Sequence, residues 1–131
     1  MKEAMYYNKN GDGSVVCRLC PHHCKIAPGR TGICKVRKNI DGKLYSINYG
    51  RVSSGAMDPI EKKPLYHFYP GSAIFSVGSI GCNFRCKFCQ NWQIAQLTEI
   101  PTDEISAKEL VDAAKRQKNN IGIAYTYNEP T

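Results

Sequence analysis

The sequence predicts an α/β fold, in which a small cysteine-rich β segment precedes the opening part of a parallel sheet. Two observations carry this prediction. An apolar run at Ala73–Val77 is followed by an amphipathic helical stretch over residues 106–118 and by a second apolar, partly β-branched run at Ile121–Tyr127. Strand, helix and strand in this order form a βαβ unit, whose two strands are parallel neighbours joined by a right-handed crossover. The cysteines lie ahead of this unit and on the loop that leaves its first strand.

Residues 1–72 are expected to form an N-terminal extension with a metal site and a hairpin. A short strand is predicted at Ser14–Val16, and the prolines and glycines between residues 21 and 32 indicate turns. Ile33–Lys38 and Lys43–Tyr49 flank an Asp-Gly pair, which favours the positive φ values of a tight hairpin turn. Residues 50–72 are rich in Pro, Gly and aromatic residues, so they are expected to be an irregular connector.

Residues 73–131 are expected to form the first βαβ portion of a larger core. Ser106 and Glu109 have the spacing of a capping box, which opens the helix, and its apolar stripe follows the i, i+3, i+4, i+7 rule. A parallel sheet of only two strands leaves its edges and one face open. The sequence therefore predicts the start of a larger α/β sheet or barrel.

Composition limits the classes of function. The 131 residues are 42% hydrophobic and 22% charged, which is ordinary for one globular core. No apolar stretch is long enough to span a bilayer, and Met1–Lys9 lacks the apolar core of a secretory signal, so we expect a cytoplasmic protein without a membrane partner. The formal charge is +7, but the basic residues are scattered and filled thiolate sites would reduce the excess. Nucleic-acid binding is therefore not expected.

The seven cysteines fall into two tight groups. An odd number in a chain without a targeting signal argues against a disulfide framework and favours metal binding. The first group has spacings of two, three and nine residues, and consists of Cys17, Cys20, Cys24 and Cys34. Four thiolates form a closed tetrahedral set, which is typical of structural zinc. An auxiliary iron-sulfur cluster is the alternative, and spacing does not separate the two.

The second group consists of Cys82, Cys86 and Cys89, on the loop that follows the first predicted core strand. Three cysteines at spacings of three and two residues can hold three corners of a cubane cluster and leave the fourth iron open to a small molecule. The alternative is a structural zinc site, whose fourth ligand would come from outside the loop, such as His67.

Three segments together resemble a known family. Residues 17–34 read Cys-x-Leu-Cys-Pro-x-x-Cys-x-Ile-x-x-Gly-x-x-Gly-x-Cys, residues 59–68 read Pro-Ile-Glu-Lys-Lys-Pro-Leu-Tyr-His-Phe, and residues 81–91 read Gly-Cys-Asn-Phe-Arg-Cys-Lys-Phe-Cys-Gln-Asn. The chain resembles the N-terminal part of the radical S-adenosylmethionine (SAM) enzyme of the AmmeMemoRadiSam system, and is similar to pyruvate formate-lyase activating enzymes. The resemblance covers about residue 14 to 131 and implies the start of a partial (β/α) barrel.

The resemblance also implies site residues. Cys82, Cys86 and Cys89 would ligate a [4Fe–4S] cluster whose open iron binds SAM, and Phe88 would lie against the adenine. Glu129 matches the acidic residue of a Gly-Gly-Glu motif that touches the SAM amino group, although Tyr127-Asn128 replaces the glycine pair. No catalytic side chain is assigned beyond these cofactor contacts, because the cofactor carries the chemistry.

The implied activity is reductive cleavage of SAM to a 5′-deoxyadenosyl radical, which abstracts hydrogen from a protein or small-molecule substrate. A flavodoxin- or ferredoxin-like electron donor would be a partner, and a protein substrate another. We expect little SAM cleavage by the 131-residue chain alone, because an incomplete barrel does not exclude water. The alternative function is a non-catalytic metal-binding module, either a two-site zinc protein or an electron-transfer iron-sulfur protein.

Overall fold

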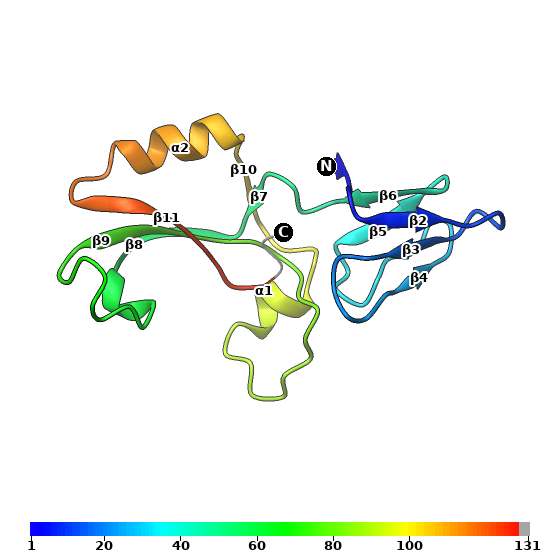
Figure 1. Cartoon of the computed structure of the whole chain (residues 1–131), viewed down its shortest axis with the longest axis horizontal. Helices are drawn as coiled ribbons and strands as arrows, with labels where there is room; N and C mark the ends of the chain where they lie inside the picture. The colour runs from blue at the N-terminus through cyan, green and yellow to red at the C-terminus, as the bar shows by residue number, and fades with distance from the viewer. Residues whose placement is uncertain (129–131) are drawn as a thin grey trace.

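Two small antiparallel sheets form the N-terminal part of the chain, up to Ser46. The structure is a computed structural model that describes residues 1–128. One sheet has the order β1-β6-β5 and the other the order β2-β3-β4, and both lie in the right half of Figure 1. Their bounds are β1 Lys2–Glu3, β2 Tyr7–Lys9, β3 Val15–Cys17, β4 Lys25–Ile26, β5 Arg37–Ile40 and β6 Lys43–Ser46.

The hairpin predicted around the Asp-Gly pair is confirmed, with shorter strands than expected. β5 and β6 pair antiparallel, and Asp41 and Gly42 turn the chain with φ values of 49° and 76°. The buried Asn39 side chain ties this hairpin to the other sheet. It donates to the carbonyl oxygens of Gly13 at 3.0 Å and Ile26 at 2.9 Å and accepts from the Gly42 N–H at 3.0 Å. Val15, Cys17, Ile26 and Leu44 form the core between the sheets.

A third three-stranded sheet, which is mixed, follows in the order β11-β9-β8. β8 spans Ser54–Pro59, β9 spans Ala73–Gly78 and β11 spans Asn120–Thr126. β11 runs parallel to β9, as predicted, and α2 (Ala107–Lys115) connects them along one side of the sheet in Figure 1. The predicted capping box is present, since Ser106 accepts from the Glu109 N–H and Glu109 accepts from the Ser106 N–H.

The predicted fold class, the start of a radical SAM partial (β/α) barrel, is wrong. The described chain consists mostly of small β-sheets and has only two short helices, α1 (Trp92–Gln96) and α2. Residues 50–72 were expected to be irregular, but β8 pairs antiparallel with β9 over six residue pairs. β9 therefore has one antiparallel neighbour, and a sheet of this kind is not the uniformly parallel start of a barrel.

Short elements complete the chain. β7 (Arg51–Val52) pairs antiparallel with β10 (Asp103–Glu104), and a 3₁₀ turn (η1, Ile60–Lys62) follows β8. Within residues 1–128, no helix is long and apolar enough to cross a membrane.

Candidate metal centre

The loop that carries the second cysteine group begins where β9 ends. Gly81 starts the loop with a φ of 80° and donates its N–H to the Ile94 carbonyl at 2.9 Å. A Cβ atom at this position would lie 2.6 Å from the Cys34 carbonyl oxygen and 2.5 Å from the Val36 Cγ1. Both the backbone angle and the close approach therefore require glycine here.

The loop presents its three thiols at its surface. Cys82 and Cys89 are half-buried and Cys86 is exposed. The Phe84 N–H donates to the Cys82 Sγ at 3.4 Å, and the Cys89 N–H donates to the Cys86 carbonyl at 3.2 Å, which closes a turn between these two cysteines. Phe88, the residue expected against the adenine, is 86% exposed. The loop is thus a folded turn whose donors and aromatic ring are accessible from solvent.

Hydrogen bonds hold this loop to α1. Arg85 donates to the Gln96 side-chain oxygen, and the Gln96 Nε2 donates to the Phe84 carbonyl at 2.9 Å. Gln96 closes α1, so the helix fixes one side of the loop. Neither α1 nor the contact of Arg85 with Gln96 was predicted from the sequence. The one local feature of the sequence that relates α1 to the loop is the short interval between the third cysteine and Trp92–Gln96.

Further hydrogen bonds hold the loop to the first cysteine group. Arg85 Nη2 donates to the Ile33 carbonyl at 2.8 Å, and a ring nitrogen of His22 lies 2.9 Å from the Asn83 carbonyl oxygen. Lys35 Nζ donates to the Gln96 carbonyl at 2.7 Å. The two cysteine segments, which are far apart in the sequence, therefore lie side by side.

The first cysteine group surrounds one hollow. Cys17 lies on β3, and the Cys17 N–H donates to the Cys24 carbonyl at 3.0 Å. The His23 N–H donates to the Cys20 carbonyl at 3.2 Å. This bond closes a turn in which His23 has a φ of 43°. All four cysteines line a hollow of about 10 Å³ together with Arg37 and apolar neighbours. The structure thus places all four predicted ligands around this hollow.

Donor chemistry fits metal binding in both groups, although neither forms a finished coordination sphere. None of the seven cysteines, all of which lie in the described part of the chain, forms a disulfide. Among residues 1–128, no three Cys, His, Asp or Glu side chains have ligand geometry about a common point. Burial raises the pKa of the Cys17 thiol, while the nearby Arg37 guanidinium acts in the opposite direction. Soft sulfur donors without a carboxylate in either group suit zinc or iron-sulfur clusters rather than Mg²⁺ or Ca²⁺.

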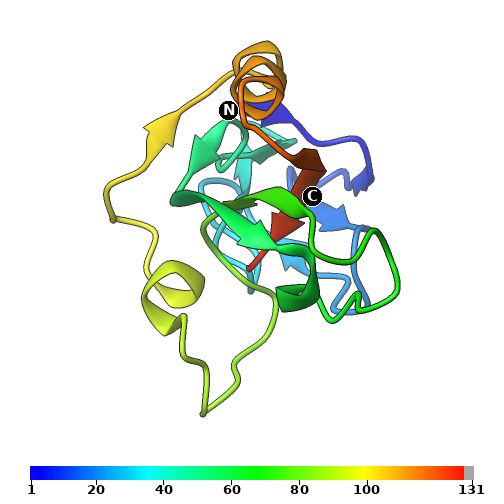
Figure 2. The ribbon, with the colours of Figure 1, turned by 90° about the vertical axis from the view of Figure 1, so that its left-hand side faces the viewer.

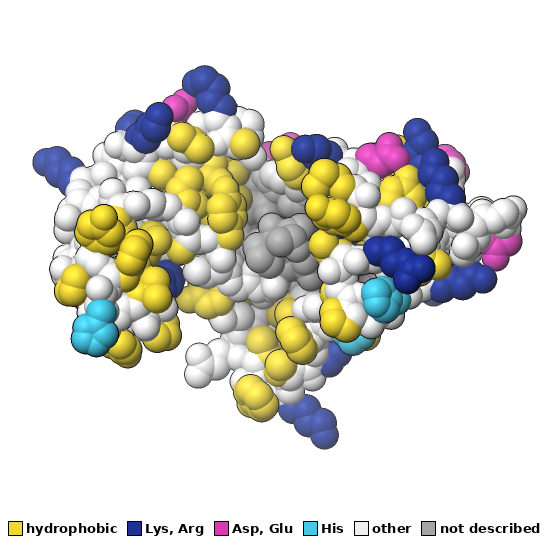
Figure 3. All heavy atoms as spheres, in the orientation of Figure 1, with side chains coloured by type: hydrophobic (Ala, Val, Ile, Leu, Met, Phe, Trp, Pro, Cys, Tyr) yellow, Lys and Arg dark blue, Asp and Glu magenta, His cyan; other side chains and the backbone are white. Residues whose placement is uncertain are grey.

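His67 is poorly placed as a fourth ligand for the second group. It lies on the segment that precedes β9, whereas Cys82 follows the end of β9, and the strand has six residues. The two segments are well separated in both views (Figure 1, Figure 2). The His67 segment carries exposed apolar side chains, which form a patch at the lower left of Figure 3: Leu65, Tyr66, Phe68 and Tyr69.

The end of β11 approaches the start of the cysteine loop. Thr126 is in register with Gly78, and the Asn128 Nδ2 donates to the Ser79 carbonyl at 2.6 Å. Tyr127 and Asn128 have φ values of 61° and 66°, in the left-handed region that favours glycine. Glu129, the expected SAM contact, lies outside the described residues.

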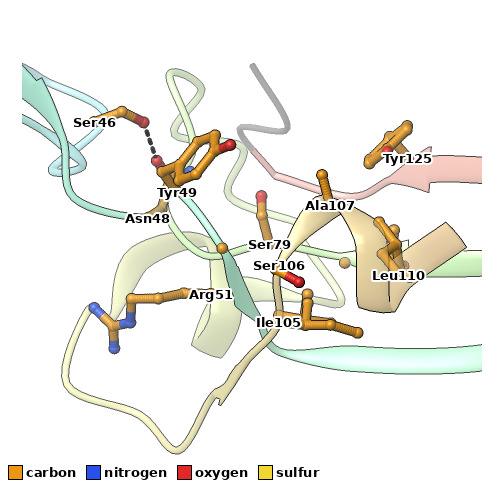
Figure 4. Close-up of a pocket in the computed structure, with 14 residues that line it drawn as sticks. Ser46, Asn48, Tyr49, Arg51, Ser79, Ile105, Ser106, Ala107, Leu110 and Tyr125 are labelled. Atoms are coloured by element: carbon orange, nitrogen blue, oxygen red, sulfur yellow. Dashed lines mark hydrogen bonds between the residues drawn. The ribbon is translucent and has the colours of Figure 1, made fainter. Parts of the chain in front are cut away.

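A separate cavity of about 180 Å³ lies between the N-terminal sheets, β9 and the start of α2 (Figure 4). Arg51, Ser79, Leu110 and Tyr125 are among its lining residues, and Ser46 Oγ donates to Asn48 Oδ1 at 2.7 Å at its edge. No cysteine lines this cavity, so it is distinct from both candidate metal centres.

Comparison with known proteins finds relatives without an assigned activity. The chain is 53% identical over 133 residues to the uncharacterized protein MJ0808 of Methanocaldococcus jannaschii, a match that covers 100% of this chain and 40% of that protein. It is 30% identical over 122 residues to the uncharacterized protein MJ0674 of the same organism, covering 88% of this chain and 31% of that protein. The chain thus spans well under half the length of these relatives. No family model and no solved structure matches it.

Proposed function

We propose that Cys82, Cys86 and Cys89 bind a [4Fe–4S] cluster and that the chain belongs to a radical SAM enzyme. The observation that carries the proposal is the set of three thiols, at spacings of three and two residues, on a loop that leaves the carboxyl end of β9. Three thiolates leave one iron of a cubane open to an exogenous ligand. When bound there with SAM, the cluster would supply the electron that cleaves the sulfonium carbon–sulfur bond and yields methionine and a 5′-deoxyadenosyl radical.

The surroundings of the loop support this proposal. The carboxyl ends of β9 and its parallel neighbour β11 lie together, and ligands of parallel sheets bind at such ends. The Phe84 N–H donates to the Cys82 Sγ at 3.4 Å, which orients this side chain on the loop. Arg85 and Gln96 fix the loop, so the spacing of the three donors is held by neighbouring elements rather than by the loop alone.

Two residues would contact SAM in this proposal. The exposed Phe88 ring is free to stack on the adenine. Glu129 would accept hydrogen bonds from the SAM amino group. The replacement of a glycine pair by Tyr127-Asn128 is compatible with this role, because both residues adopt the backbone region that glycine favours.

Partners follow from the same proposal. Lys87 is exposed beside the three cysteines, so an acidic electron donor of the flavodoxin or ferredoxin kind would be attracted to this loop. The substrate would be a protein or a small molecule that loses a hydrogen atom. We place the reaction in the cytoplasm, where thiols remain reduced.

A non-catalytic zinc module is the less well supported function. Zinc normally takes four ligands, and the second group offers three. His67, the candidate for the missing ligand, lies beyond the opposite end of β9.

Metal analysis after anaerobic purification separates the two functions. We expect iron and sulfide to be bound by the unchanged chain and lost from Cys86→Ala. Lys87→Ala is the matched control, because it alters an exposed neighbour in the same loop and should retain both. Zinc in place of iron, or iron content unaffected by Cys86→Ala, would reject the cluster.

A further inference from the structure

The hollow between Cys17, Cys20, Cys24 and Cys34 has room for a single ion. Its volume is about 10 Å³, and a cavity needs roughly that volume to hold one water molecule. Four thiols around so small a hollow are a complete ligand set for one tetrahedral ion.

The backbone around the hollow brings the cysteine-bearing segments together. Cys17 and Cys24 are joined by a backbone hydrogen bond of 3.0 Å across β3 and β4. Gly32 lets the segment before Cys34 approach them, because a Cβ atom at this position would lie 3.5 Å from the Cys24 Sγ and 3.2 Å from the Ile26 Cδ1. Three stretches of chain thus border the same hollow, and each of them contributes at least one cysteine.

A buried cation borders the same hollow. Arg37 is 4% exposed and lines the hollow with the four cysteines. Its guanidinium donates to the Asn48 Oδ1 at 3.2 Å, which is a neutral acceptor. No carboxylate in the part of the chain that the structure describes forms an ion pair with Arg37. Burying an arginine without a counter-charge is costly, so a negative group is expected next to it.

We propose that Cys17, Cys20, Cys24 and Cys34 bind one Zn²⁺ as a tetrathiolate site, and that Arg37 is its buried counter-charge. A Zn²⁺ ion with four thiolates carries a net charge of −2, which compensates the guanidinium. Each cysteine loses its proton to solvent as it binds, and no electron is transferred. Closed four-thiolate sites are structural, and this one would join β3, β4 and the segment before β5, which share only a small apolar core.

The test uses the full chain with all three cysteines of the second group changed to alanine, so that its outcome is independent of the proposed cluster. We expect this protein to bind one zinc per chain by elemental analysis, with no iron or sulfide. Replacement of zinc by Co²⁺ should give the intense visible absorption of a tetrahedral cobalt site and sulfur-to-cobalt charge-transfer bands in the near ultraviolet. Iron and sulfide in this protein, or a cobalt spectrum without thiolate bands, would overturn the proposal.

The role of Arg37 as a counter-charge is tested in the same protein, in which the second cysteine group is changed to alanine. Changing groups that neighbour metal ligands typically lowers metal affinity 10–100-fold, so Arg37→Met should weaken zinc binding by about that factor in competition with a chelator. Arg37→Lys keeps the charge and should restore part of the affinity, which a purely steric role would not predict. Arg30→Met, at an exposed position nearby, is the control. Equal zinc affinity for Arg37→Met and Arg30→Met would refute the role of Arg37.

Discussion

Arg85 donates a hydrogen bond of 2.8 Å to the carbonyl oxygen of Ile33, and this contact links the two cysteine groups. Ile33 precedes Cys34, while Arg85 precedes Cys86. Loss of structure in the first cysteine group should therefore also loosen the loop that carries the second group. The contact of His22 with Asn83 also links the two cysteine segments, and that of Lys35 with Gln96 links the first segment to α1.

Removing this link should loosen the proposed cluster. We expect Arg85→Ala to lose iron several-fold faster than the unchanged chain in an anaerobic chelator challenge, because the loop loses its hydrogen bonds to Ile33 and Gln96. Lys87→Ala should release iron at the original rate. Identical iron release from both variants would show that Arg85 does not hold the loop.

Gly81→Ala should destabilise the fold strongly. The new Cβ would lie 2.6 Å from the Cys34 carbonyl oxygen, at a φ of +80°. Gly71→Ala is a matched control, because Gly71 has a φ of +77° and nothing within 4 Å of the added atom. We expect Gly71→Ala to lower the free energy of unfolding by ~1 kcal/mol through backbone strain alone, and Gly81→Ala by ~3 kcal/mol or more. Urea denaturation measures both. Equal losses would contradict the close packing of the loop against Cys34.

Asp58 should make the fold sensitive to acid. Hydrogen bonds from Lys62 and then Lys63, both 2.7 Å long, hold the pKa of the buried Asp58 carboxyl well below its usual range. A carboxyl whose pKa is lower in the folded state stabilises the fold fully above its unfolded pKa, about 3.9, and loses that contribution as the pH falls towards the folded pKa.

Asp58→Asn isolates this effect. We expect it to lower the free energy of unfolding by ~1–2 kcal/mol at pH 7, because both lysines lose a charged partner. The difference from the unchanged chain should shrink as the pH falls below 4. Asp41→Asn, at an exposed turn that also suits asparagine, should change little at either pH. A constant difference between pH 7 and pH 2.5 would argue against the ion pairs.

Asn39 should be essential to the N-terminal sheets that position Cys17 and Cys34. Asn39→Ala leaves the carbonyl oxygens of Gly13 and Ile26 and the Gly42 N–H without their partner. We expect a loss of ~2–4 kcal/mol in unfolding free energy by thermal or urea denaturation. Asn8→Ala, on the exposed strand β2, is the control. A similar loss from both variants would mean that the buried hydrogen bonds contribute little.

Local chemistry predicted several elements correctly. The Asp41-Gly42 pair predicts its hairpin because few other dipeptides adopt two positive φ values. Ser106 and Glu109 predict the start of α2 because their side chains satisfy N–H groups within one turn. The parallel pairing of β9 with β11 follows from the order of strand, helix and strand.

The fold class could not be obtained in the same way. β8 reads Ser-Gly-Ala-Met-Asp-Pro, which has neither alternating hydrophobicity nor β-branched residues. Its pairing with β9 is a tertiary effect that overrides local propensity, and it replaces the expected parallel sheet with a mixed one. The five residues of α1 are likewise too few for a helical period to be recognised.

The candidate sites, like the fold, could be predicted only where local sequence carries the information. Cysteine spacing predicted a shared metal site for Cys17 and Cys34, and both residues line the same hollow in the structure. Burial of Arg37 and the contact of Arg85 with Ile33 depend on side chains far apart in the sequence, and no local pattern encodes them.

Mössbauer spectroscopy of the anaerobic, ⁵⁷Fe-reconstituted chain, recorded with and without SAM, tests the central claim most directly. The account predicts a [4Fe–4S] cluster in which the signal of a single iron changes when SAM is added, since the other three are held by Cys82, Cys86 and Cys89. A cluster whose four irons remain unchanged by SAM, or the absence of any cubane, would contradict it.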